Sequence, residues 1–282
     1  MRRNAIAQQP LAPEDPSGEN RPSQVQSDSS QTSPGTDTVD VPQYGLLKVL
    51  VLHLLPGALA TLAYLALVPL ASRVHFPTMS ALLLSAAIAL VPLEMGHLLL
   101  QGKRLNGCWS LAGIVLYQRK WAGWRYFLMA LGLFVLSVAG YTLSEPLDHV
   151  WKHVAFSWLP GRYVFSDLEQ YAQFSRTVLI VTFSARLLLD GFLFHIVEEL
   201  YFRGYLLPRM SRFGWAAPFL NCALFSIYHF WQPYNLPTIF FVSLPMVFAV
   251  WKSKNVRVGI YTHILLNVVG GITTLITVLH PS

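Results

Sequence analysis

The sequence predicts an all-α fold, a polytopic bundle of seven to eight transmembrane helices that follows a polar N-terminal tail. Two properties of the 282-residue chain predict it. First, 54% of the residues are hydrophobic and only 12% are charged, whereas about a quarter of the residues in an ordinary soluble domain are charged. Second, the apolar residues are gathered into runs close to the length of about 20 residues that a membrane-spanning helix requires. With only two cysteines, the chain also does not fit a disulfide-built secreted domain.

The first 43 residues differ in composition from the rest of the chain. They carry six acidic and three basic residues, are rich in Pro, Ser, Gln and Thr, and contain few branched apolar residues. Such a segment cannot bury enough apolar surface to offset the entropy that it would lose on ordering. We therefore expect residues 1–43 to form a disordered cytoplasmic tail and residues 44–282 to form the transmembrane domain.

Seven apolar runs follow the tail, and each is a candidate transmembrane helix. They are residues 46–71, 77–100, 126–143, 178–207, 215–230, 236–251 and 258–279. Charged residues interrupt the fourth run, and the fifth and sixth runs are short. Residues 110–117 are too short to span a membrane, and residues 150–174 mix Trp, Tyr and Phe with charges. We expect both of these stretches at the membrane interface.

Lys and Arg cluster in three of the loops between the runs. Five basic residues lie between the second and third runs, two between the fourth and fifth, and three between the sixth and seventh, with no acidic residue among them. Because cytoplasmic loops carry an excess of Lys and Arg, these loops predict a multi-pass protein of the cell membrane with a cytoplasmic N-terminus. They also account for the net charge of +6, so no nucleic-acid partner is expected.

Several ionisable or polar side chains lie inside the runs, where they are costly and by default face the protein interior. They are Glu198, Glu199 and Arg203 on the fourth run, His229 on the fifth, and His263 and Asn267 on the seventh. At a rise of ~1.5 Å per residue, the two Glu, the two His and the Asn reach a common layer below the predicted cytoplasmic surface from three helices. Purely structural polar residues have no reason to converge in depth, so the convergence indicates a functional site.

This set of side chains suits the hydrolysis of an amide. Glu198 is a candidate general base that, together with His229, can hold and deprotonate a water molecule. His263 and Asn267 lie one helical turn apart, so both can donate to the oxyanion that develops on the attacked carbonyl. The sequence contains no Gly-x-Ser-x-Gly elbow and no His-Glu-x-x-His helix, which would indicate a different hydrolytic chemistry.

Each group also has a purely structural interpretation. Glu199 and Arg203 have the i,i+4 spacing of an ion pair and can simply neutralise each other. Alternatively, Glu199 can orient the site through Arg203 or share protons with its neighbour. His229 can be a core histidine, and His263 with Asn267 can form hydrogen bonds between helices.

Two further pairs lie within apolar runs. Arg186 and Asp190 also have the i,i+4 spacing, and we interpret them as a structural ion pair. Glu94 and His97 on the second run are spaced i,i+3. We expect them to form an interior pair, with the border of a site as the alternative.

Three motifs on successive runs together resemble those of the CPBP intramembrane proteases, which include the CAAX prenyl endoproteases and bacterial relatives tied to bacteriocin processing and self-immunity. The motifs are Glu198-Glu199-x-x-x-Arg203, Phe225-x-x-x-His229 and His263-x-x-x-Asn267. The paired-Glu motif alone is weak, whereas all three at these spacings are specific. The resemblance covers residues 175–280, the motif-bearing core of a transmembrane protease domain that would comprise residues 44–282.

The resemblance implies an all-helical membrane bundle, commonly of eight spans, so one span can be missing from the count of seven. Residues 110–117 or part of residues 150–174 would supply it. It also implies roles for the site residues. Glu198 and His229 would activate the water, His263 and Asn267 would stabilise the oxyanion, and Glu199 and Arg203 would support the site.

The reaction, its cofactor and its substrate leave alternatives open at this stage. A metal-free mechanism is favoured because the His-Glu-x-x-His motif is missing, and the alternative is a zinc ion held by Glu198, His229 and His263. The expected partners are membrane lipid and a peptide or protein substrate, lipid-modified or not. The competing functions are a non-catalytic membrane scaffold or self-immunity protein and an ion-coupled transporter. The sequence shows no internal repeat that would support a transporter.

Overall fold

Helices make up nearly all of the regular structure in the computed structural model, which describes residues 41–280. No β-strand forms within this range, so the predicted all-α class is confirmed. The predicted disordered tail lies outside the described residues, apart from its last three positions.

Several helices run on from one another as continuous rods. The elements are α1 (Leu46–Arg73), α2 (Thr78–Ser85), η1 (Ala86–Leu90), α3 (Val91–Asn106), α4 (Gly123–Phe156), η2 (Gly161–Tyr163), η3 (Leu168–Tyr171), α5 (Arg176–Leu188), η4 (Leu189–Phe194), α6 (His195–Glu198), η5 (Glu199–Leu206), η6 (Leu207–Phe213), α7 (Ala216–Tyr228), η7 (Pro233–Asn235), α8 (Leu236–Ser253) and α9 (Val256–Leu279). The second rod extends from α2 to α3, and the fourth extends from α5 to η6.

Six rods in the described part of the chain are long and apolar enough to cross a membrane. They are residues Leu46–Arg73, Thr78–Asn106, Gly123–Phe156, Arg176–Phe213, Pro233–Ser253 and Val256–Leu279. The fifth predicted run forms the shorter apolar helix α7, which brings the apolar helices to the seven expected. The chain is therefore a multi-pass membrane protein.

The third predicted run is too short, because α4 has 34 residues and ends at Phe156. A helix of that length measures about 51 Å at 1.5 Å per residue, well beyond the ~30 Å hydrocarbon core. Its last turns therefore extend past the apolar run and take up the start of the stretch expected at the interface. The remainder of residues 150–174 forms short 3₁₀ turns, and residues 110–117 form no helix. Neither candidate supplies an eighth span.

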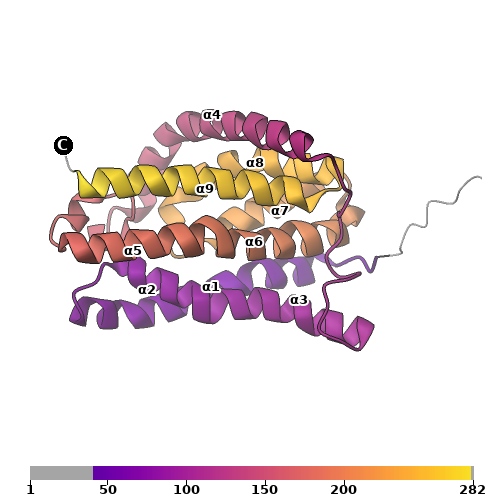
Figure 1. Ribbon diagram of the computed structural model, residues 1–282, viewed down its shortest axis with the longest axis horizontal. Coiled ribbons are helices and arrows are strands. Elements are labelled where there is room, and N and C mark those ends of the chain that lie inside the picture. The colour runs from indigo at the N-terminus through magenta and orange to yellow at the C-terminus, as the bar shows by residue number, and fades with distance from the viewer. Residues whose placement is uncertain (1–40, 281–282) are drawn as a thin grey trace, which may run out of the picture. The chain divides into compact units, whose positions relative to one another are not determined.

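The N-terminal helices and α4 lie on opposite faces of the bundle (Figure 1). The α1 helix packs on α2 and α7, whereas α4 packs on α8 and α9. The rod that contains α5 and α6 lies between these two faces and contacts α9. Large apolar side chains such as Leu47, Phe127 and Leu143 are exposed on the outside, as a lipid-facing surface requires.

The three basic loops meet at one end of the bundle. The loop before α4 forms an isolated bridge from Gln118 to Asn255, in the loop before α9. Arg209, one of the two basic residues between the fourth and fifth runs, donates from Nη1 to the Ile114 carbonyl of the loop before α4, at 3.1 Å. Burial raises the pKa of Tyr117 to about 12, so its neutral hydroxyl accepts a hydrogen bond from Lys254 at 3.0 Å. These contacts place the predicted cytoplasmic loops on the same side.

Candidate active site

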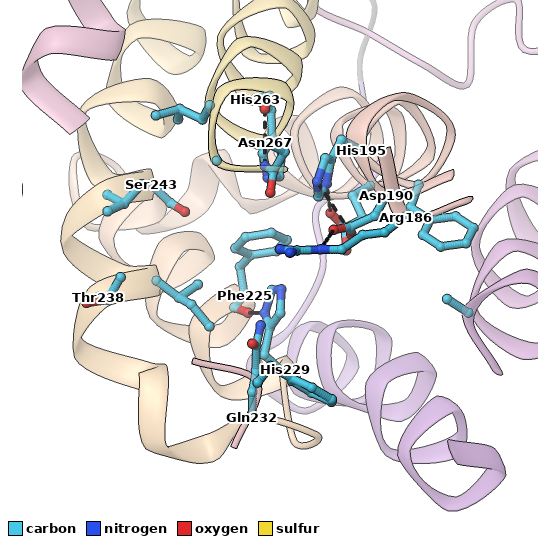
Figure 2. Close-up of a pocket in the computed structure, with 18 of the residues that line it drawn as sticks. Arg186, Asp190, His195, Phe225, His229, Gln232, Thr238, Ser243, His263 and Asn267 are labelled. Carbon is cyan, nitrogen blue, oxygen red and sulfur yellow. Dashed lines mark hydrogen bonds and ion pairs between the residues drawn. The ribbon is translucent and has the colours of Figure 1, made fainter. Parts of the chain in front are cut away.

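A cavity of about 480 Å³ lies between the helices that carry the three motifs (Figure 2). Its lining includes Glu198, His229, His263 and Asn267, the four predicted catalytic residues. They come from α6, the end of α7 and α9, which are far apart in sequence. The convergence in depth that the spacing of the runs predicts is therefore present as a shared cavity.

The helix that carries the paired glutamates has an irregular backbone on both sides of them. The π-helical segments η4 and η5 flank the single regular turn of α6, and such segments often occur at functional sites. Glu198 lines the cavity, whereas Glu199 lies behind the cavity wall. The two side chains are 3% and 0% exposed, so each carboxyl group depends on protein partners.

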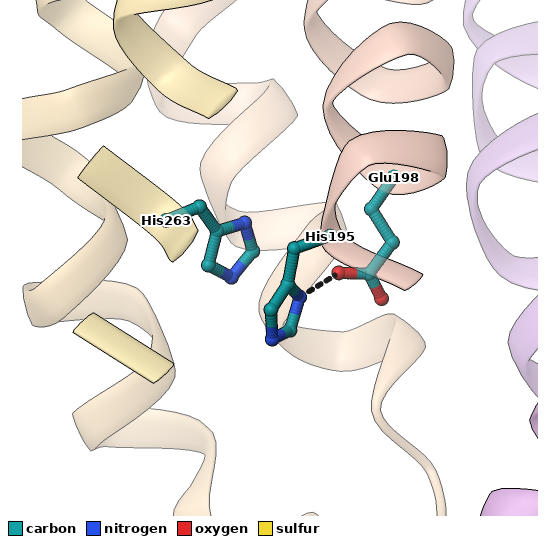
Figure 3. A group of neighbouring side chains, drawn as sticks. All are labelled: His195, Glu198 and His263. Atoms are coloured by element: carbon teal, nitrogen blue, oxygen red, sulfur yellow. Dashed lines mark hydrogen bonds and ion pairs between the residues drawn. The ribbon is translucent and has the colours of Figure 1, made fainter. Parts of the chain in front are cut away.

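The Glu198 carboxylate has a partner on each oxygen. His195 Nδ1 donates to Oε2 at 2.9 Å, as Figure 3 shows. The Tyr228 hydroxyl lies 3.3 Å from Oε1. The motifs did not identify His195, although its i,i+3 spacing to Glu198 on one helix face was a readable signal.

Glu199 makes contacts different from those of its neighbour. Its Oε1 accepts a hydrogen bond from His263 Nδ1 at 3.0 Å and lies 3.3 Å from Arg203 Nη1. Gly259 on α9 makes room for this carboxyl group, because a Cβ at that position would collide with it. The Arg203 guanidinium is fully buried and lies 3.9 Å from the centre of the Phe225 ring. The predicted i,i+4 pair is confirmed, and it supports His263 directly.

The remaining predicted residues each have one nitrogen fixed by the protein. His229 Nδ1 donates to the Phe225 carbonyl at 2.8 Å, so its Nε2 carries a lone pair and is not engaged. Asn267 donates one amide proton to the His263 carbonyl at 3.1 Å and keeps its second. Both side chains line the cavity.

The predicted ion pair of Arg186 and Asp190 forms, with 3.4 Å between Nε and Oδ2. Both residues also line the cavity (Figure 2). Asp190 Oδ1 lies 3.7 Å from His195 Nε2, which connects the pair to the Glu198 environment. The structural interpretation of this pair is therefore incomplete.

The predicted interior pair of Glu94 and His97 does not form. Glu94 Oε1 lies 2.8 Å from the Tyr228 hydroxyl, within hydrogen-bond distance, and His97 instead bonds the Tyr205 hydroxyl at 3.1 Å. The alternative expectation, that Glu94 borders the site, fits its position one side chain away from Glu198.

The residues that best match a metal-binding group differ from the predicted set. Ligand atoms of His195, Glu198 and His263 lie within 4.8 Å of one another, and His229 is not part of this group. The rings of His195 and His263 are stacked, with centroids 3.9 Å apart and planes 20° apart. The in-plane lone pairs of stacked rings do not converge on one point, as zinc ligands must. The arrangement therefore fits a metal ion poorly.

Comparison with known proteins agrees with the motifs. Residues 180–269 match the family model described as type II CAAX prenyl endopeptidase Rce1-like. The matched segment contains all six predicted site residues. No curated protein and no solved structure gives a significant match to the chain. The chain is therefore a multi-pass membrane protein in which residues 180–269, about a third of its length, are similar to the type II CAAX prenyl endopeptidases, a family of proteases.

Proposed function

We propose that the protein is an intramembrane endopeptidase in which a water molecule held between Glu198 and His229 attacks a peptide carbonyl. The observation that supports this proposal best is the shared cavity. Its lining combines a carboxylate, two imidazoles and an amide from three separate helices. His195, Gln232 and the Arg186–Asp190 pair also line that space.

In this mechanism hydrogen bonds orient the Glu198 carboxylate, which is the general base. His195 and Tyr228 hold the Glu198 carboxylate in one orientation. The Nδ1 proton of His229 is committed to the Phe225 carbonyl, so its Nε2 lone pair is free to accept a hydrogen bond from the water. Glu198 removes a proton from the water molecule while the water oxygen forms a bond to the carbonyl carbon of the peptide.

The oxyanion formed in that step is met by His263 and Asn267. His263 donates from Nε2, and the Glu199 carboxyl group bonded to Nδ1 fixes the orientation of the ring. Asn267 supplies the amide proton that its backbone contact leaves free. The proton taken by Glu198 then passes to the departing nitrogen as the C–N bond breaks, which restores the carboxylate.

The substrate proposal follows from the cavity and its place in the membrane. Alongside the catalytic set, the lining contains apolar side chains such as Leu83, Phe134, Val242 and Met246. We infer a peptide or protein substrate that presents an apolar, lipid-modified segment to the cavity. The basic end of the bundle, with the start of α1, faces the cytoplasm in this proposal.

The test uses full-length protein in lipid nanodiscs and a quenched fluorescent peptide that ends in an S-farnesylated CaaX sequence. We expect the wild type to cleave it and Glu198→Gln or His229→Ala to lose cleavage by about a thousandfold or more. Glu145→Gln is the matched control, because this glutamate is exposed on α4.

Two results would oppose the proposal. Full activity in Glu198→Gln would show that Glu198 is not the general base. If no peptide is cleaved, precursor accumulation in cells that carry Glu198→Gln provides the second readout. Complete rescue of a deletion strain by that variant, with no accumulating precursor, would instead favour the non-catalytic scaffold or self-immunity function.

A further inference from the structure

Two carboxyl groups in this site share a single hydroxyl group. The Tyr228 hydroxyl lies 2.8 Å from Glu94 Oε1 and 3.3 Å from Glu198 Oε1. The three residues come from α7, α3 and α6, and none is more than 3% exposed. Glu94 does not line the cavity, and the Tyr228 hydroxyl is the hydrogen-bonding group that joins it to Glu198.

A hydroxyl group has one proton and can donate it to only one of the two carboxyl groups. If both glutamates were ionised, one carboxylate oxygen would face the lone pairs of the Tyr228 oxygen. Glu94 Oε2 has no hydrogen-bond partner within the described range, and no Lys, Arg or His in that range forms an ion pair with Glu94. A buried carboxylate without a cation is costly.

One proton on Glu94 removes this conflict. The protonated carboxyl donates to the Tyr228 oxygen, and Tyr228 donates its own proton to Glu198. We propose that Glu94 is a neutral, proton-bearing positioning residue that orients the Glu198 carboxylate through Tyr228. This inference rests on the proposed function of Glu198. In this arrangement Glu94 donates to Tyr228 and Tyr228 donates to Oε1 of Glu198, while His195 donates directly to Oε2 of Glu198.

The proton on Glu94 is tested without a substrate. Full-length wild type and Glu94→Gln in nanodiscs are compared by infrared difference spectroscopy at neutral pH. We expect the wild type to show the carbonyl stretch of a protonated carboxyl that is missing in Glu94→Gln. In Tyr228→Phe the band should stay but shift, because the carboxyl loses its acceptor. Absence of the band from the wild type would overturn the proposal.

The positioning role is tested by kinetics with the farnesylated fluorescent peptide. Tyr228→Phe and Glu94→Leu should lower kcat about tenfold, the effect expected for losing one hydrogen bond, and should leave KM unchanged. Glu94→Gln should keep most of the activity, because its amide can donate to Tyr228 as the acid does. Tyr201→Phe is the matched control, since this buried hydroxyl donates to the Leu52 carbonyl.

The outcomes separate this inference from the proposed function. A wild type that cleaves no peptide, together with no precursor accumulating in cells that carry Glu198→Gln, contradicts the proposed function, and the infrared band then still decides whether Glu94 holds a proton. With an active wild type, an unchanged kcat in Tyr228→Phe would overturn the positioning role. So would an equal loss in Glu94→Gln and Glu94→Leu, because it would mean that the charge of Glu94 is needed. Where Glu94→Leu does not purify as a monodisperse protein, Tyr228→Phe alone decides.

Discussion

The two halves of the bundle contribute to the site in different ways. The helices from α5 to α9 supply every predicted catalytic residue and nearly all the buried charge, whereas α1 to α4 supply mainly shape. In the first half, Glu94 is the single buried acidic residue within the described range, and the Tyr228 hydroxyl joins it to Glu198. We infer that the second half carries the proposed chemistry, while the first half helps to fix where the side chains of the site point.

The largest effect on stability should come from breaking the buried ion pair in the second half. Arg203→Ala leaves Glu199 buried without its cation, which should lower the free energy of unfolding by about 3–5 kcal/mol. The measurement is denaturant unfolding in detergent micelles. Arg73→Ala, at the exposed end of α1, is the control and should change the stability little. A similar loss of unfolding free energy in both variants would contradict the expectation that the buried charge of the second half matters more for stability.

The next effect concerns His195, which lies beside the base in the second half. His195→Leu removes the hydrogen bond to Glu198 Oε2, and a bond to a charged group is worth about 1.5–3 kcal/mol. We therefore expect kcat to fall roughly 10- to 100-fold, measured with the same fluorescent peptide. His149→Leu on the exposed face of α4 should retain wild-type kcat. An unaffected kcat in His195→Leu would show that Glu198 needs no partner there.

A smaller effect should follow from a change of shape in the first half. Gly57 on α1 contacts the end of α7 so closely that a Cβ would collide with the Tyr228 backbone. Gly57→Ala should cost about 1–3 kcal/mol of stability by overpacking. It should also lower activity, because a shift of the Tyr228 backbone would displace His229, the next residue in the chain. The matched variant is Gly96→Ala on α3, where a Cβ meets no atom within 4 Å. It should stabilise the helix by about 0.5–1 kcal/mol. Equal behaviour of the two variants would contradict the close packing.

Hydropathy predicted most of the fold because the membrane sets the length and polarity of a spanning helix. It failed at α4, whose last turns extend beyond the apolar run and therefore carry no hydropathy signal. The short helix α7 was predicted as a run but is not long enough to span by itself. Its 13 residues are apolar because neighbouring helices cover them.

The candidate site was predictable where its residues share one helix face. The i,i+4 spacings of Glu199 with Arg203 and of His263 with Asn267 could be read from the chain directly. The contact between Glu94 and Tyr228 could not, because it joins residues 134 positions apart and depends on how α3 packs against α7. The catalytic roles of the predicted residues stay predictions until the variants are assayed.

The smallest expected effect is that of metal removal, and it tests what kind of chemistry the second half performs. His195 Nδ1 and His263 Nδ1 are already bonded to Glu198 and Glu199, and the stacked rings do not direct their remaining nitrogens to one point. We therefore expect dialysis against a strong chelator to leave peptide cleavage unchanged. Elemental analysis of the purified protein should find less than one zinc ion per chain. Stoichiometric zinc, with cleavage lost on chelation and restored by added zinc, would instead show that the two rings rotate to share a metal ion. Glu198 would then act as its ligand and not as a free base.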